Sequence, residues 1–407
     1  MPTPRPRLAA AVLAALVLLV AACSSDDEGS DATTTTAPGG DAAPSAPGEE
    51  GGATGVEDLE QWTERGPYGV GSQQLALADG RRVVVWYPAE EGAGTEEPVE
   101  TFDIASLLNP DLQAQIPAEM RVQYPIPAAP GAEPDASGGP YPVVLFSHGF
   151  AGFPEQSADL VTHLASWGYV VAAPDHVERS LSGLLGTAAQ GVAEREDVDV
   201  LDETLDLVVA QGDDDASPLS GLVDAEQVAV AGHSAGAGAA YRMASSDDRI
   251  DAVATYSVGT GGDEGLPEAP DVPALVMLGE RDGIIPPEAT REVYEGLSAP
   301  RYLVEVPDSG HLVFSDLCLI GAEQGGLIGI VEAIELPIPD DLKALGSDGC
   351  DTAEYLPADE AFPSIDSLSI AFLDGYLRGD AAAVDALAAW PEDGLPGQPP
   401  VTLTVDA

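Results

Sequence analysis

The sequence predicts an α/β fold with a doubly wound, mostly parallel sheet and helices on both faces. Short continuous apolar runs, typical of strands covered on both faces, alternate with amphipathic segments of helical length. This alternation favours a parallel sheet, because parallel strands need a crossover of helix length. Apolar residues make up 44% of the 407 positions, which is enough for one large core.

The expected elements follow from local patterns. The predicted strands are residues 73–77, 82–87, 143–146, 170–173, 228–231, 252–256, 274–278 and 302–306. The predicted helices are residues 156–167, 197–210 and 365–377. Ala78-Asp79-Gly80 separates the first two strands, so we expect these two to form a hairpin. The helix-length segments between later strands exclude a sandwich of antiparallel strands.

Residues 1–22 are predicted to be a bacterial lipoprotein signal peptide. Arg5 and Arg7 precede a short apolar run that is too short to span the ~30 Å hydrocarbon core. The run ends in Val20-Ala21-Ala22-Cys23, which resembles the lipobox, whose cysteine is lipidated in that class of proteins. We therefore expect lipid on Cys23 and anchoring at the outer face of the bacterial cell membrane. An ordinary secretory signal with an incidental cysteine is the alternative.

The composition divides the mature chain into three parts. Residues 23–60 are predicted to be a disordered acidic tether, since they are too poor in apolar side chains to offset the entropy of folding. Residues 61–387 are expected to form the folded domain. Residues 388–407 are rich in Pro and Gly and are expected to form a C-terminal tail.

The charge balance is strongly acidic, with 15 Lys and Arg against 70 Asp and Glu and a formal net charge of -55. Such a surface repels phosphate backbones, so nucleic-acid binding is excluded, and no membrane contact is expected other than the lipid anchor. The acidity is interpreted as a means of hydration and solubility.

Two of the three cysteines remain when Cys23 is set aside. Exported proteins fold in an oxidising compartment, where an even number of cysteines indicates a disulfide. We predict that Cys318 and Cys350 form one. Two buried free thiols are the alternative.

Gly232-His233-Ser234-Ala235-Gly236 directly follows a predicted strand and precedes a helix-like stretch. This is the setting of a nucleophile elbow, in which a sharp strand-to-helix turn presents a serine hydroxyl. Larger residues at the two glycines would collide with neighbouring chain. Ser234 is therefore the predicted nucleophile.

A serine nucleophile needs a general base, and His311 is the candidate because it follows the last predicted strand on a loop. The acid that orients the base should end a strand between nucleophile and base, and Asp282 fits. Glu280 and Asp308 are the alternatives for this acid.

Two backbone N–H groups should form an oxyanion hole. The expected donors are Ala235, after the nucleophile, and Phe150, in the glycine-containing loop 147–152. Phe153, Leu312 and Phe314 are expected to flank the site together with Phe150. Residues 319–356 form a candidate lid. No metal or organic cofactor is expected, because no ligand spacing of histidines and cysteines occurs.

These motifs resemble those of the serine α/β-hydrolase superfamily over most of residues 61–387. The chain is most similar to platelet-activating-factor acetylhydrolases and to dienelactone-hydrolase-like and polyester-hydrolase-like esterases. The similarity is carried by the runs at residues 142–150 and 232–236, with Gly66-Pro67-Tyr68 and Val85-Trp86-Tyr87-Pro88 nearer the N-terminus. Ala237 replaces a glycine that is usual in this group. Dienelactone hydrolases proper use a cysteine nucleophile, and Ser234 argues against their activity.

The resemblance and the motifs together predict a secreted, lipid-anchored serine hydrolase that cleaves carboxylic esters through an acyl-enzyme. The expected substrate is a small neutral ester with an apolar acyl or aromatic group. An amidase or peptidase on the same scaffold and a catalytically silent surface-binding lipoprotein are the two alternatives.

Overall fold

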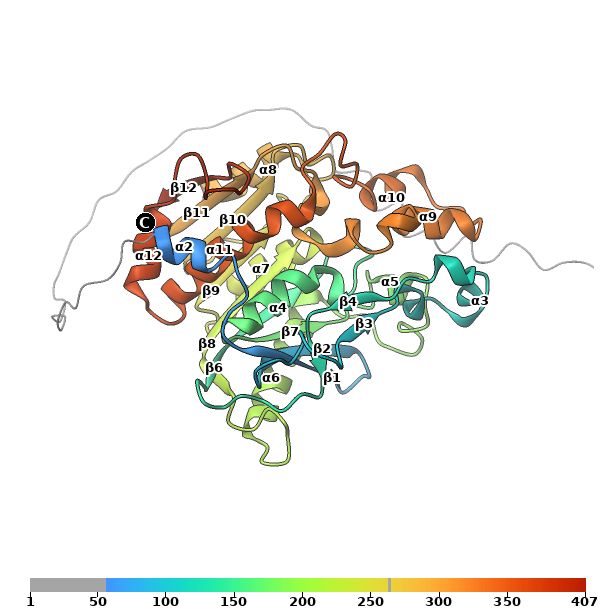
Figure 1. Cartoon of the computed structure of the whole chain (residues 1–407), viewed down its shortest axis with the longest axis horizontal. Coiled ribbons are helices and arrows are strands. Elements are labelled where there is room, and N and C mark those ends of the chain that lie inside the picture. Colours follow the sequence, from blue (N-terminus) through green and yellow to red (C-terminus); the bar gives the residue numbers. More distant parts are fainter. Residues whose placement is uncertain (1–55, 263–264) are drawn as a thin grey trace, which may run out of the picture. The chain divides into compact units, whose positions relative to one another are not determined.

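The computed structural model describes residues 56–262 and 265–407. Its centre is a sheet with the strand order β12-β11-β10-β9-β8-β6-β7-β2-β1-β5 (Figure 1). The strands are β1 Gly69–Ala76, β2 Arg82–Ala89, β5 Ala129–Pro130, β6 Tyr141–Ser147, β7 Val170–Pro174, β8 Val223–His233, β9 Ala252–Tyr256, β10 Ala274–Gly279, β11 Arg301–Val306 and β12 Thr402–Asp406. From β7 to β11 all neighbouring strands are parallel. The predicted fold class is confirmed.

Antiparallel pairs lie on both sides of these parallel strands, and the terminal strand β5 pairs parallel with β1. β1 and β2 form the predicted hairpin, and β2 also pairs antiparallel with β7. At the other end β12 pairs antiparallel with β11. The sheet is therefore mixed, with the parallel strands in its centre.

Helices cover both faces of the sheet. α4 Ala158–Ser166, α11 Ala358–Tyr376 and α12 Ala381–Ala388 pack in one core, and α6 Asp197–Asp213, α7 Ala235–Ala244 and α8 Pro287–Gly296 pack in the other. The strand sequences explain the two cores. In β6, Val144 and Phe146 enter the first core while Val143 and Leu145 enter the second, because successive side chains point to opposite faces.

The folded body extends beyond both predicted limits. α2 Val56–Gln61 begins within the predicted tether, and its Leu59 is buried and accepts a 2.7 Å hydrogen bond from Ser367. The predicted tail contains β12, whose alternation of polar and apolar residues suits an exposed edge strand. The many prolines and glycines before β12 concealed this signal. The signal peptide and Cys23 lie outside the described residues.

Additional segments gather beside the sheet, on the side where α3, α5, α9 and α10 appear in Figure 1. One insertion holds the two-stranded sheet of β3 Glu100–Phe102 and β4 Tyr124–Ile126. It also contains η1 Ile104–Leu107, α3 Pro110–Gln113 and η2 Ala118–Met120. The short helices η3 Pro154–Ser157 and α5 Leu181–Leu184 follow β6 and β7 respectively.

A second insertion follows β11. It begins with η5 His311–Phe314 and η6 Asp316–Cys318, and continues through η7 Ala322–Gln324, α9 Gly326–Ala333 and α10 Asp340–Leu345. A disulfide joins Cys318 to Cys350, as predicted, and closes this segment into a loop. We call residues 319–349 the cap. Among the described residues, no helix is long and apolar enough to span a membrane.

Candidate active site

Ser234 occupies a strained turn between β8 and α7. Its backbone has φ 59° and ψ -121°, a positive φ that non-glycine residues rarely adopt. The flanking glycines are required by close backbone approach. A Cβ on Gly232 would lie 2.2 Å from the carbonyl oxygen of Gly236, and one on Gly236 would lie 2.0 Å from that of Ser147. Only glycine fits at these two positions.

The structure brings the three predicted triad side chains together. Nε2 of His311 lies 2.9 Å from Oγ of Ser234, and Nδ1 of His311 lies 2.8 Å from Oδ2 of Asp282. The imidazole of His311 is fully buried, so few waters compete for these contacts. This is the arrangement that lets a histidine accept a serine proton while a carboxylate orients it.

Asp282 is held as an anion at the end of β10. Its Oδ1 accepts hydrogen bonds of 2.8 Å from the N–H groups of both Ile284 and Ile285. Burial raises the pKa of Asp282, but the hydrogen bond from His311 and these two backbone donors bring that pKa below its ordinary value. The two alternative candidates for the orienting acid lack such contacts with the described residues. Glu280 is exposed, and Asp308 forms no side-chain hydrogen bond with any described residue.

The loop that carries His311 is fastened to the cap. The carboxylate of Asp348 accepts a hydrogen bond from the N–H of His311, and the carbonyl of Asp348 accepts one of 3.1 Å from Leu312. A Cβ on Gly310 would lie 2.5 Å from the Cα of Gly349. The position of the base therefore depends on the end of the cap.

Gln156 links the loop after β6 to the elbow. Its Oε1 accepts a 2.9 Å hydrogen bond from the N–H of Gly149, and its Nε2 lies 3.0 Å from Nδ1 of His233. Nε2 of His233 in turn lies 3.0 Å from the carbonyl of His311. Burial, together with the nearby His311, lowers the pKa of His233 to about 3, so this ring is neutral and structural.

The two predicted oxyanion donors remain available. The N–H groups of Phe150 and Ala235 donate no hydrogen bond to any group in the described part of the chain. The N–H of Gly149, by contrast, is already bound to Gln156. A Cβ on Gly149 would lie 3.3 Å from Cβ of Ser234, so this loop runs directly alongside the nucleophile.

Arg179, which was not predicted from the sequence, forms hydrogen bonds with this loop. Its guanidinium donates 2.9 Å hydrogen bonds to the carbonyl of Gly149 and to Oγ of Ser147, and it also contacts the carbonyl of His148. Its Nε donates to Asp197 at 3.0 Å. Burial raises the pKa of Asp197, but the charge of Arg179 holds it well below its ordinary value.

A second Ser-His-Asp chain lies beneath the loop. Oγ of Ser147 is 3.0 Å from Nε2 of His176, whose Nδ1 is 3.0 Å from Oδ1 of Asp197. Ser147 and His176 are completely buried and do not line the pocket described below. No substrate can reach this serine, so the chain is structural.

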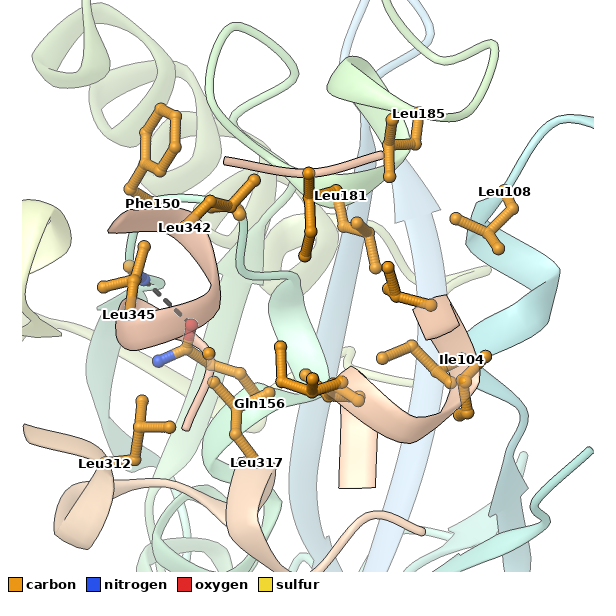
Figure 2. Close-up of a pocket in the computed structure, with 18 of the residues that line it drawn as sticks. Ile104, Leu108, Phe150, Gln156, Leu181, Leu185, Leu312, Leu317, Leu342 and Leu345 are labelled. Atoms are coloured by element: carbon orange, nitrogen blue, oxygen red, sulfur yellow. Dashed lines mark hydrogen bonds between the residues drawn. The ribbon is translucent and has the colours of Figure 1, made fainter. Parts of the chain in front are cut away.

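A pocket opens in front of Ser234 and His311, with about 970 Å³ of empty space, part of it open to solvent. Its walls are almost entirely aliphatic (Figure 2). Phe150 and Leu312 line it, as predicted. Phe153 and Phe314 do not, because both are buried in the first core, where Phe153 stacks on Phe102. In the described residues no cluster of three or more His, Cys, Asp or Glu side chains could hold a metal ion.

The sheet and the strand-turn-helix at Ser234 define an α/β-hydrolase fold. Residues 128–311, less than half of the chain, match the model of the dienelactone hydrolase family, and this stretch includes Ser234, Asp282 and His311. Among solved structures, the ferulic acid esterase from Streptomyces cinnamoneus has a similar fold, with a TM-score of 0.53 and 22% sequence identity. That alignment covers 83% of this chain and 97% of the esterase chain. No curated protein matches this sequence.

Proposed function

We propose that this protein is a serine esterase that hydrolyses carboxylic esters through an acyl-enzyme. The observation that carries the proposal is the continuous contact from Ser234 through His311 to Asp282 at the wall of an apolar pocket. The family match over the same residues supports it.

The proton path follows from the hydrogen bonds. Asp282 accepts the Nδ1 proton of His311, so Nε2 is left unprotonated and faces the hydroxyl of Ser234. Nε2 takes the serine proton as Oγ attacks the ester carbonyl, and then delivers that proton to the departing alcohol. A water molecule repeats the sequence on the acyl-enzyme and releases the acid. The anionic Asp282 stabilises the imidazolium in both steps.

The negative charge of each tetrahedral intermediate falls on the former carbonyl oxygen. In the proposal, the N–H groups of Phe150 and Ala235 bind this oxygen. Ala235 is the first residue of α7, where the helix dipole adds to the stabilisation of an anion. Neither N–H group donates another hydrogen bond within the described residues, so both are available to donate to the oxyanion in the transition state.

The direct test compares Ser234→Ala with the wild type on short-chain p-nitrophenyl esters. We expect kcat to fall at least about 10⁴-fold, together with loss of labelling by a fluorophosphonate. Ser245→Ala is the matched control, because Ser245 lies at the other end of α7, away from the pocket, and should retain activity. Wild-type turnover by Ser234→Ala would refute the proposal. Faster turnover of a matched anilide than of the ester would indicate an amidase instead.

We also propose that the protein is anchored by lipid on Cys23 at the outer face of the bacterial membrane. The support is the sequence Val20-Ala21-Ala22-Cys23 after a short apolar run. Incorporation of labelled palmitate into the wild type, but not into Cys23→Ala, is the expected result. Equal recovery of both forms in the soluble fraction would contradict it.

A further inference from the structure

We propose that the pocket is a slot for one extended aliphatic chain of the ester substrate. This inference rests on the proposed function and names the substrate class of that same site. No Asp, Glu, Lys or Arg is among the described residues that line the pocket. The lining consists mainly of Leu, Ile and Val side chains from three separate segments of the chain.

The cap supplies most of these side chains. Its pocket-lining aliphatic residues are Leu327, Ile328, Ile330, Val331, Ile334, Leu336, Ile338, Leu342 and Leu345. Of these only Ile330 is buried, whereas the others are half-buried because they face the empty pocket. The charged residues between them, such as Glu332 and Asp341, are exposed. The cap therefore presents an apolar inner face that packs only in part against the first core, through Leu327, Ile330 and Ile334, and an apolar chain would complete its burial.

The same pocket is lined by residues next to Ser234 and by residues of η1 and α5. Figure 2 shows Phe150 and Leu345 at one end and Leu108 and Leu185 at the other. Ser234 belongs to the end with Phe150, because Gly149, which precedes Phe150, lies against it. The far end is formed by η1 and α5, which Asn109 joins by a 2.8 Å hydrogen bond to the carbonyl of Leu185. A substrate with its carbonyl at Ser234 would extend its chain toward Leu108 and Leu185.

The polar side chains of the pocket are all at the reacting end, and they already form hydrogen bonds with other groups of the protein. Gln156 binds Gly149 and His233 through its two amide atoms, and His311 binds Ser234. No side chain further along the slot can donate to or accept from a phenol hydroxyl or a sugar. A hydroxylated aromatic acyl group would lose its hydrogen bonds to water there without replacement, whereas methylene groups lose none. The chemistry of the walls therefore selects an aliphatic chain.

The experiment measures kcat/KM for p-nitrophenyl esters from acetate to dodecanoate and for p-nitrophenyl ferulate. For the wild type we expect a rise of roughly fourfold per added methylene until the slot is filled, as burial of CH₂ groups predicts. The ferulate ester should be a poorer substrate than an aliphatic ester of similar size. A maximum at acetate, or a preference for ferulate, would overturn the inference.

Leu185→Trp shortens the far end of the slot. We expect it to lower kcat/KM for the dodecanoate ester at least about tenfold while leaving the acetate ester within about twofold. Leu184→Trp is the matched control, because Leu184 is the preceding half-buried leucine and does not line the pocket. Equal effects of the two substitutions on the long ester would contradict the assignment of the far end.

A binding measurement separates this inference from the proposed esterase. Ser234→Ala cannot perform the acyl transfer, yet its slot is unchanged. We expect 1-dodecanol, but not 1-butanol, to displace the neutral dye Nile red from this variant, and Leu185→Trp in the same background to weaken the displacement. Displacement without ester turnover by the wild type would refute only the esterase. Turnover without any dependence on chain length or displacement would refute only the slot.

Discussion

The guanidinium of Arg179 donates a 2.9 Å hydrogen bond to the carbonyl of Gly149, and this carbonyl belongs to the same peptide group as the N–H of Phe150. The peptide is trans, so its N–H points away from its carbonyl. Because the carbonyl and the N–H belong to one planar peptide group, the hydrogen bond from Arg179 to the carbonyl also fixes the direction of the Phe150 N–H. The positive charge also polarises the peptide and strengthens that donor.

Arg179→Lys should therefore impair the chemical step. Lysine keeps the charge but cannot reach Gly149, Ser147 and Asp197 with one planar group. We expect kcat to fall about 10- to 100-fold with little change in KM, since the donor acts mainly in the transition state. Steady-state kinetics on an aliphatic ester provide both values.

Arg195→Lys is the control for this substitution. Arg195 pairs with Glu203 and does not contact the loop at 147–152, so its replacement should leave kcat unchanged. Circular dichroism and the Tm of both variants separate a positioning effect from unfolding. A folded Arg179→Lys enzyme with wild-type kcat would show that this loop does not need the guanidinium.

Asp282→Asn should reverse the tautomer of His311. The oxygen of the amide would still accept from Ile284 and Ile285, so its NH₂ would face Nδ1 and leave the imidazole proton on Nε2. His311 could then no longer accept the serine proton, and kcat should fall about 10⁴-fold near neutral pH. Asp308→Asn changes the alternative acid and should retain activity to within about threefold. The reverse ranking of the two variants would reassign the orienting acid.

Asp316 makes stability depend on pH. Burial, together with the negative charge of the nearby Asp159, raises the pKa of Asp316 to about 7, and a hydrogen bond from Tyr124 opposes this shift. The ordinary value is 3.8, so between about pH 4 and 7 the folded state holds a proton that the unfolded state has released. The contribution of this group to the free energy of unfolding therefore falls as the pH rises through that window.

Urea unfolding of Asp316→Asn at pH 5 and pH 8 checks this sign. Relative to the wild type, the variant should gain stability on going from pH 5 to pH 8, by on the order of a few kcal/mol at most. The comparison over pH is the readout, because the amide can accept only one of the two hydrogen bonds that Asp316 accepts from Tyr124 and from the N–H of Asp159. Glu91→Gln, at an exposed position, should show no such change. A constant difference at the two pH values would contradict the assignment.

The disulfide between Cys318 and Cys350 should hold the cap over the pocket. Replacing both residues by serine should lower the free energy of unfolding by about 3–4 kcal/mol in the chain-entropy model. It should also flatten the preference for long esters, since the cap supplies most of the slot. Non-reduced protein should show no reactive thiol at these two positions. Equal chain-length profiles with and without the disulfide would show that the cap needs no covalent closure.

The fold could be predicted from the sequence wherever the hydrophobic pattern was continuous. β9 was predicted at its observed limits, and β10 and β11 within one residue, because buried parallel strands consist of uninterrupted aliphatic residues. β12 was missed because an edge strand is half polar and here follows a segment rich in proline and glycine. α11 begins several residues before its predicted start, and this unpredicted part contains Pro363, a residue that argues against a helix interior in the sequence.

The same distinction separates the site residues that could be predicted from those that could not. Ser234, Asp282 and His311 could be predicted because each follows a strand of a parallel sheet, and the carboxyl ends of such strands share one edge. Gln156, Arg179 and Asp348 could not, since their contacts depend on the path of loops and insertions that no periodic pattern encodes. The cap residues have helical spacing, but nothing in the sequence indicates that their partner is an empty pocket.

The cap departs from the body at Cys318 and rejoins it at Asp348, both close in sequence or space to the base His311. Residues 319–347 lie between these two anchor points; they include most of the aliphatic residues that line the pocket and form no hydrogen bond with the triad side chains. We therefore expect that residues 319–347 can be exchanged without changing the triad. Exchanging them for another sequence, with both anchors retained, would give a route by which this scaffold acquires new substrates while its proton relay stays intact.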